Sequence, residues 1–205
     1  MNEWLAFFYS FLFVMSVLGT ASLLYRFQVV DAETSRKLIH IGVAHWFFFV
    51  PLFDSLFVAM IAPVSFIGLN FMSQRFRIVQ SMERLDAEDY GTVYYAVALS
   101  VITYVSVVFD LYTIGLVSML ILGWGDGLAA LVGRYAQGPM IRVSKSVYGA
   151  LAMLSASLIV GLIFLNSIGV SIIVALIATA TEVWTPKGFD NLSVPLLSML
   201  LLWLL

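Results

Sequence analysis

Residues 111–135 read LYTIGLVSMLILGWGDGLAALVGRY, an apolar run that contains a single carboxylate, Asp126. A helix needs about 20 mainly apolar residues to cross a hydrocarbon core of roughly 30 Å, so this run predicts a membrane-spanning helix. Asp126 comes eight residues before Arg134, which on a helix corresponds to about 12 Å along the axis. The run therefore places an ionisable group inside the membrane layer, near one end of the helix.

The composition of the whole chain supports a membrane protein. Of its 205 residues, 62% are hydrophobic and 11% are charged, and the mean hydropathy is +1.03. Soluble domains are about 45–50% apolar and about 25% charged, so a soluble domain and a disordered chain are excluded. A net charge of −2 gives no basic surface for nucleic acid, and we expect no such partner. The chain has no Cys and only 2 His, which excludes a disulfide framework and a Cys-ligated zinc site.

We predict an all-α, polytopic integral membrane protein with seven to eight transmembrane helices. A cleaved signal peptide fits the first apolar segment poorly, because that segment has no basic start and is long and aromatic. The last segment has fewer residues than the others, so we expect a short span, a tilted helix or an interfacial helix there. The predicted spans cover residues 4–25, 38–53, 55–72, 91–109, 111–135, 147–165, 168–184 and 192–205.

The basic residues indicate how the chain lies in the membrane. All ten fall in alternate connections, and the remaining connections contain none. By the positive-inside rule, the N-terminus lies outside and the four basic connections lie in the cytoplasm. The same alternation supports the eighth span and places the C-terminus outside. The basic residues are Arg26, Arg36, Lys37, Arg75, Arg77, Arg84, Arg134, Arg142, Lys145 and Lys187.

Asp126 is a candidate functional residue. A charge inside a bilayer costs roughly 2.5–3.5 kcal/mol on insertion scales and usually serves function. The glycines around it, at 123, 125 and 127, weaken the helix and let other groups approach its backbone. The spacing of Gly125, Ala129 and Gly133 also forms a ridge of small residues suited to close helix packing. Packing explains the glycines, but it leaves Asp126 unexplained.

Lys145 and Ser146 precede an apolar segment in the next basic connection. A lysine at a helix N-terminus is suited to phosphate, because the helix end offers free N–H groups and a partial positive charge. Alternatively, Lys145 is an ordinary positive-inside lysine and Ser146 caps the helix. The two interpretations are equally open at this point. The mixed-charge connection 74–90 is solvated, or its basic residues meet lipid head groups or a nucleotide.

Further polar residues lie at the same predicted end of other spans. Helix capping explains Asp190 or Asn191 but explains Glu182 poorly, because Glu182 lies within an apolar run. Arg36, Lys37 and His40 lie at the entry of the second span, where a lone His is also commonly a structural residue. Carboxylates together with cations suit a divalent metal and a polyphosphate, with a lipid as the second substrate. Transporters also bury carboxylates, so the spacing alone does not distinguish a metal-and-phosphate site from a transport site.

Three ordered motifs resemble those of the dolichol kinase and phytol kinase family, which includes CTP-dependent diacylglycerol kinases. They are RKLIHIG at 36–42, GDGLAALVGR at 125–134 followed by Lys145-Ser146-x-x-Gly149, and Thr181-Glu182 with Asp190-Asn191-Leu192-x-x-Pro195. The resemblance covers nearly the whole chain after the first span. Tyr148 departs from the residue that the family often carries before the glycine.

The resemblance implies one transmembrane catalytic domain over residues 1–205. It would transfer the terminal phosphate of CTP to the hydroxyl of a polyprenol, dolichol or phytol-type lipid or of diacylglycerol. Mg²⁺ or another divalent cation would assist, membrane lipids would surround the enzyme, and a homo-oligomer is left open. The lipid would reach a site that faces the cytoplasm.

The resemblance also implies roles for single residues. Asp126 would bind the metal or position the acceptor hydroxyl, with Glu182 or Asp190 as the second carboxylate. Lys145 would neutralise phosphate, assisted by Arg36 and Lys37, and His40 would orient phosphate or accept a proton. The remaining contacts to nucleotide or substrate would come from Arg134, Ser146, Gly125, Gly127, Gly149 and Asn191.

Two other functions fit part of the pattern. A CTP:phosphatidate cytidylyltransferase would attack the other end of the triphosphate, but the chain lacks that enzyme's Gly-His-Gly-Gly segment and paired aspartates. A small membrane transporter would fit a helix broken at residues 123–127. The polar residues gather near one predicted face rather than at the midplane in two matching halves, which argues against transport.

Overall fold

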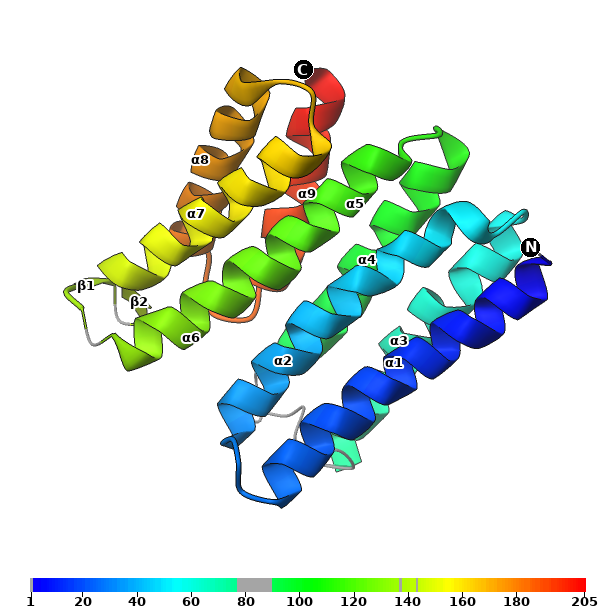
Figure 1. Ribbon diagram of the computed structural model, residues 1–205, viewed down its shortest axis with the longest axis horizontal. Helices are drawn as coiled ribbons and strands as arrows, with labels where there is room; N and C mark the ends of the chain where they lie inside the picture. Colours follow the sequence, from blue (N-terminus) through cyan, green and yellow to red (C-terminus); the bar gives the residue numbers. More distant parts are fainter. Residues whose placement is uncertain (1, 77–89, 137, 143) are drawn as a thin grey trace.

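The computed structural model describes residues 2–76, 90–136, 138–142 and 144–205, and these form a helical bundle with one short hairpin (Figure 1). The all-α prediction is confirmed. The elements are α1 (Glu3–Arg26), α2 (Ala32–Ala44), the 3₁₀ helix η1 (His45–Leu52), α3 (Leu56–Phe76), α4 (Gly91–Val108), α5 (Tyr112–Leu120), the π-helix η2 (Ile121–Asp126), α6 (Gly127–Tyr135), β1 (Met140–Arg142), β2 (Lys145–Ser146), α7 (Val147–Phe164), α8 (Ile168–Trp184) and α9 (Asp190–Leu204).

Within the described ranges, five helical stretches are long and apolar enough to cross a membrane. They are α1, α3, α4, the continuous run Tyr112–Tyr135 and α7. The helices α8 and α9 are apolar but shorter. The predicted second span falls on α2 and η1, which follow each other without a break. A 3₁₀ helix rises about 2.0 Å per residue, against 1.5 Å in an α-helix, so η1 extends further than its residue number suggests.

The outer surface of the bundle suits a lipid environment. Large apolar side chains remain exposed on several helices, including Phe57 at 73% and Ile168 at 69% of their full accessibility. Soluble monomers rarely expose apolar surface on this scale, whereas lipid tails cover it without cost. The inward faces carry the buried aromatic and aliphatic residues, such as Trp46, Phe47 and Leu99.

The helix around Asp126 is not broken. It runs continuously through α5, η2 and α6, with a π-helical stretch where the sequence suggested weakened backbone. The glycines serve packing at this point. An added Cβ at Gly125 would lie 2.4 Å from the Met153 sulfur, and one at Gly127 would lie 2.4 Å from Ile41 Cγ1. The absence of side chains therefore lets α2 and α7 pack directly against the central helix, and the feature that favoured a transporter is absent here.

Hydrogen-bonded caps fix where two site-bearing helices begin. Asp31 Oδ1 accepts the N–H of Thr34 (2.8 Å) at the start of α2, and this bond lowers the pKa of Asp31. Ser146 Oγ accepts the N–H of Gly149 (3.1 Å) at the start of α7. The capping interpretation of Ser146 is therefore confirmed.

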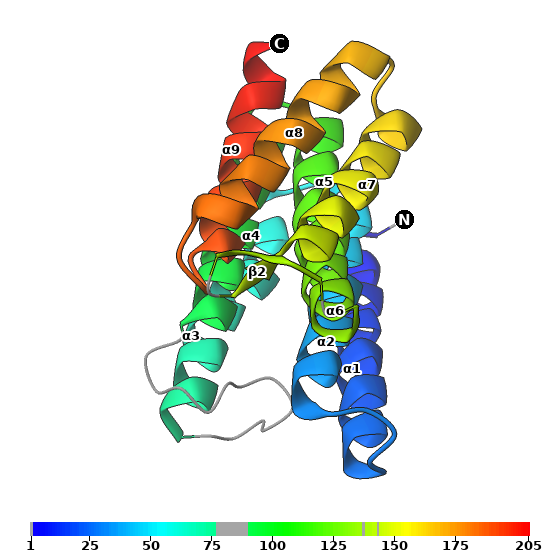
Figure 2. The same ribbon diagram turned by 90° about the vertical axis from the view of Figure 1, so that its left-hand side faces the viewer.

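Three of the basic connections meet at one end of the bundle. Arg134 Nη2 lies 2.8 Å from Asp31 Oδ2, which joins the end of α6 to the connection before α2. Arg142 donates to the carbonyl of Trp184 (2.9 Å), which joins the hairpin to the end of α8. Figures 1 and 2 show the α1–α2 turn, the hairpin and the α8–α9 turn at this end. Arg77 and Arg84, in the fourth basic connection, lie outside the described residues.

Candidate active site

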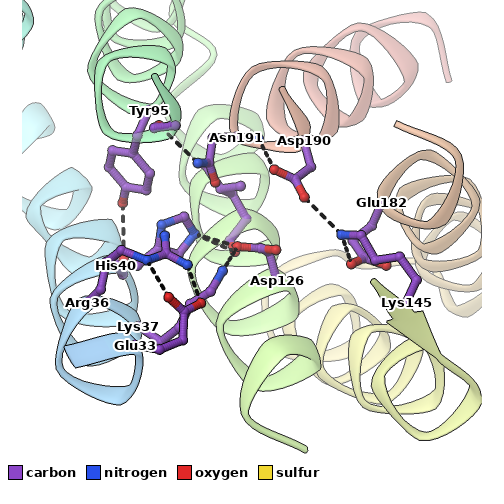
Figure 3. Close-up of polar contacts among 12 residues, drawn as sticks. Glu33, Arg36, Lys37, His40, Tyr95, Asp126, Lys145, Glu182, Asp190 and Asn191 are labelled. Carbon is purple, nitrogen blue, oxygen red and sulfur yellow. Dashed lines mark hydrogen bonds and ion pairs between the residues drawn. The ribbon is translucent and has the colours of Figure 1, made fainter. Parts of the chain in front are cut away.

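Asp126 lies at the end of η2, in the middle of a polar cluster formed with α2 (Figure 3). Its carboxylate forms an ion pair with Lys37 Nζ, and its Oδ2 lies 3.2 Å from His40 Nε2. All three side chains are buried. The α-helical spacing of Lys37 and His40 brings both to the face of α2 that packs on the central helix.

Lys145 forms the second half of the cluster. Its Nζ pairs with Glu182 Oε1 at the end of α8 and lies 2.9 Å from Asp190 Oδ2 in the first turn of α9. The antiparallel pairing of β1 with β2 brings the lysine to this position. Burial alone would lower the pKa of Lys145, but the carboxylates of Asp190, Asp126 and Glu182 raise it above its usual value. Lys145 is therefore positively charged at neutral pH.

The three carboxylates form a candidate site for a divalent cation. One oxygen from each of Asp126, Glu182 and Asp190 lies within 4.8 Å of the others, and all three residues are buried. Hard carboxylate oxygens are the ligands that Mg²⁺ and similar cations prefer. Buried charges need partners, and here two lysines supply them. The donor set thus fits a divalent cation, and the structure brings together the residues that the sequence predicted.

A polar cavity of about 320 Å³ adjoins this cluster. Its volume is at the lower end of the range of about 300–1,000 Å³ that is usual for ligand sites. Acidic and basic side chains face it from α2, α6, the hairpin and the α8–α9 connection, so it suits an anion accompanied by a cation. Its polar and small lining residues include Glu33, Lys37, Asp126, Gly133, Arg134, Ser144, Lys145, Ser146, Gly149, Glu182, Lys187 and Asp190.

The start of α7 offers fewer free donors than the sequence suggested. The N–H of Val147 donates to the carbonyl of Pro139 (2.8 Å), and that of Gly149 donates to Ser146 Oγ. The expectation of a helix end with free N–H groups is therefore wrong for these two positions. The partial positive charge of the helix end remains, and Lys145 lies beside it.

Four of the predicted contact residues lie away from the polar cavity. Gly125 and Gly127 are packing positions and are not among its lining residues. Arg36 pairs with Glu33, with Nη2 2.5 Å from Oε1, and its side chain leaves α2 on a different side from Lys37. Asn191 donates to the carbonyl of Gly91 (2.9 Å). Arg36 and Asn191 both line a separate, apolar cavity.

The contacts of His40 define which atom carries its proton. Its Nε2 lies 3.3 Å from the carbonyl oxygen of Leu122 and 3.2 Å from Asp126 Oδ2. Both neighbours are acceptors, so Nε2 carries a hydrogen and donates. His40 therefore orients Asp126 through this nitrogen. A proton-accepting role would have to use Nδ1.

Two residues near the site were missed by the sequence analysis. Tyr95 donates to the carbonyl of His40 (3.3 Å), and the two rings meet edge to face at 4.7 Å. Tyr95 lies in an apolar run, and the sequence alone does not distinguish a buried tyrosine there from one that faces lipid. Glu33 forms two contacts with Arg36 and lines the polar cavity. Its i, i+3 spacing to Arg36 is a signal that could have found it.

Comparisons with known proteins agree with these motifs. The chain is 33% identical to "Phytol kinase" of Synechocystis sp. over 221 aligned residues, which cover 98% of this chain and 91% of the relative. It is 30% identical to "Probable phytol kinase, chloroplastic" of Triticum aestivum over 210 residues, which cover 87% of this chain and 69% of the relative. No family model and no solved structure matches the chain.

Proposed function

Because this chain belongs to the phytol kinase family, and is thus a phosphotransferase with an alcohol acceptor, we propose that it is a CTP-dependent lipid-alcohol kinase. The acceptor is a polyprenol, dolichol or phytol-type lipid or diacylglycerol. The observation that carries the proposal is the cluster of Asp126, Glu182 and Asp190 beside Lys37 and Lys145. The choice of CTP rests on the family resemblance, and the lipid acceptor also on the names of the relatives.

A divalent cation, Mg²⁺ or a similar ion, would be held by Asp126, Glu182 and Asp190. When bound, it supplies positive charge that offsets the charge of the phosphates during transfer. Lys145 is the central phosphate-binding side chain, because it is charged and lies between two of these carboxylates. Lys37 and Arg134 face the same cavity and add positive charge along the triphosphate. Lys187 is a further cation at its edge.

The transfer step needs little more than positioning and charge stabilisation. The oxygen of the lipid hydroxyl forms a bond to the terminal phosphorus, and the bond from that phosphorus to the bridging oxygen breaks. The hydroxyl proton passes to the carboxylate of Asp126, which His40 orients. The products are a lipid monophosphate and CDP.

We propose eight membrane spans, with the N-terminus outside and the site at the cytoplasmic end. The support is the distribution of the basic residues and the meeting of three basic connections at the end that carries the cluster. The short α9 would be the eighth span. A cytoplasmic site would have direct access to soluble nucleotide.

The test is a screen of radiolabelled CTP and ATP against phytol, polyprenols and diacylglycerol, with thin-layer separation of lipid products. The proposal predicts CDP and a lipid monophosphate. Pyrophosphate together with a CDP-lipid would instead show cytidylyl transfer. Substrate flux into sealed vesicles without nucleotide turnover would show a transporter.

A further inference from the structure

A second cavity, apolar and of about 60 Å³, lies among α1, α2, α3, α4 and the first turn of α9. A water-sized site needs about 10–15 Å³ on this measure, so the cavity has room for several atoms but not for a whole lipid. Most of its wall is hydrocarbon. The apolar side chains that form this wall include Val14, Leu18, Ile39, Phe66 and Leu99.

Neighbouring residues divide between the apolar and the polar cavity. On α2, Arg36 lines the apolar cavity and Lys37 lines the polar one. On α9, Asn191 lines the apolar cavity and Asp190 lines the polar one. His40 forms part of the apolar cavity wall, and its Nε2 lies 3.2 Å from Oδ2 of Asp126, which lines the polar cavity. Two cavities of opposite polarity thus meet at His40 and Asp126, whose contact is drawn in Figure 3.

Asn191, which lines the apolar cavity, carries a buried acceptor without a partner among the described residues. Its Nδ2 donates to the carbonyl of Gly91, whereas its buried Oδ1 has no donor in the part of the chain that the structure describes. Asn191 is 3% exposed. Buried acceptors are nearly always hydrogen-bonded, so this oxygen calls for a donor such as a hydroxyl. A hydroxyl on a hydrocarbon chain matches both this acceptor and the apolar wall.

Resting on the proposed kinase function, we infer that the apolar cavity binds the hydroxyl-bearing end of the lipid alcohol. Asn191 Oδ1 accepts the hydrogen bond of the hydroxyl while the alcohol is bound without nucleotide, and that hydrogen turns to Asp126 for the transfer. The apolar wall contacts the first carbons of the chain. The nucleotide phosphates occupy the polar cavity, and the hydroxyl meets the terminal phosphate where the two cavities adjoin, at His40 and Asp126. Asn191 is thus a substrate-positioning residue, and the wall on α1, α3 and α4 sets which alcohols fit.

The first test fills the apolar cavity. Ala96, on α4, lines it and is 1% exposed, while Ala98, on the same helix, is 0% exposed and is not among its lining residues. Ala96→Met raises KM for the alcohol about tenfold, equivalent to about 1.4 kcal/mol, and leaves KM for the nucleotide unchanged. The matched control Ala98→Met changes neither constant. A rise in nucleotide KM, or equal behaviour of both variants, would overturn the inference.

A photolabelling experiment decides even where both variants fail to fold. The wild-type protein is irradiated with a C20 isoprenoid alcohol that carries a diazirine next to the hydroxyl, without nucleotide. The expected label lies on α1, α3 and α4 and is competed by excess phytol. Label on α6 and α7, or label that phytol does not compete, would overturn the inference. Kinase activity is measured on the same protein preparation before irradiation, because absence of lipid phosphate would instead refute the proposed function.

Discussion

Nζ of Lys145 lies 2.9 Å from Oδ2 of Asp190, which links the hairpin before α7 to the first turn of α9. The same ammonium also pairs with Glu182. The Lys145 ammonium therefore bridges two carboxylates from two helices. A bound phosphate would take over part of this ion pairing.

Replacing Lys145 removes charge that is constant across the neutral range. The pKa of Lys145 is raised above its usual value: burial opposes the shift, but the nearby carboxylates outweigh it. Such a lysine is fully protonated at any pH well below its ordinary pKa. It loses its stabilising charge only as the pH rises through the raised pKa. Lys145→Met therefore lowers kcat/KM about 100-fold or more, by a similar factor at every pH from 6 to 9. A pH–rate series measures this, and a loss confined to high pH would contradict it.

Replacing Glu182 tests the binding of the divalent cation. A chelator such as EDTA abolishes turnover, and excess Mg²⁺ restores it. Glu182→Gln removes one anionic ligand, so the Mg²⁺ concentration for half-maximal activity rises about tenfold or more. The matched control is Asp54→Asn, which removes an exposed carboxylate from the connection before α3. A chelator-resistant wild type, or an unchanged Mg²⁺ requirement in Glu182→Gln, would contradict the assignment.

His40 acts by positioning Asp126. His40→Gln retains a side-chain N–H donor, whereas His40→Phe retains only a ring. Small misplacements of reacting groups cost about 100-fold in rate, so His40→Phe loses about that factor in kcat and His40→Gln loses less. The pH dependence of kcat keeps its shape in His40→Gln. If His40 were the proton acceptor, the acidic limb of that profile would move or disappear.

Gly149 is predicted to matter for stability. A Cβ at this position would lie 2.8 Å from the carbonyl oxygen of Ala129, a backbone atom that cannot move aside cheaply. Gly149→Ala therefore destabilises the fold by about 1–3 kcal/mol. At Gly19, on α1, an added Cβ meets nothing within 4 Å. Gly19→Ala is therefore neutral or stabilising by up to about 1 kcal/mol. Thermal unfolding in detergent compares the two, and equal midpoints would contradict the packing account.

The sequence predicts the helical class because continuous apolar runs have few alternatives in a membrane. Asp126 and Glu182 could be identified for a related reason, since carboxylates within apolar runs are costly and usually functional. Asp190 could not be separated from a helix cap by the sequence alone. The 3₁₀ helix η1 and the hairpin β1–β2 were not predicted. Their conformation depends on packing against other segments rather than on a local pattern.

The sequence also could not predict that adjacent residues line two different cavities. Successive helix positions differ by about 100° in direction, so Arg36 and Lys37 must face different ways. Which of them faces Asp126 depends on how α2 is rotated against the central helix, and that is a result of packing. Asn191 was identified, but its position beside the apolar cavity required the fold.

Transfer of label from γ-³²P-CTP to a lipid alcohol by Asp126→Asn protein tests directly whether the Asp126 carboxylate is required for phosphate transfer. Asn has nearly the same shape as Asp but cannot hold a cation as a carboxylate or accept the proton. We expect normal expression, a folded protein and loss of lipid-phosphate formation by at least about 1,000-fold, equivalent to about 4 kcal/mol. The control Asp110→Asn lies at the α4–α5 turn, where its positive φ of 56° suits Asn, and it retains activity. Full activity in folded Asp126→Asn protein would contradict the account.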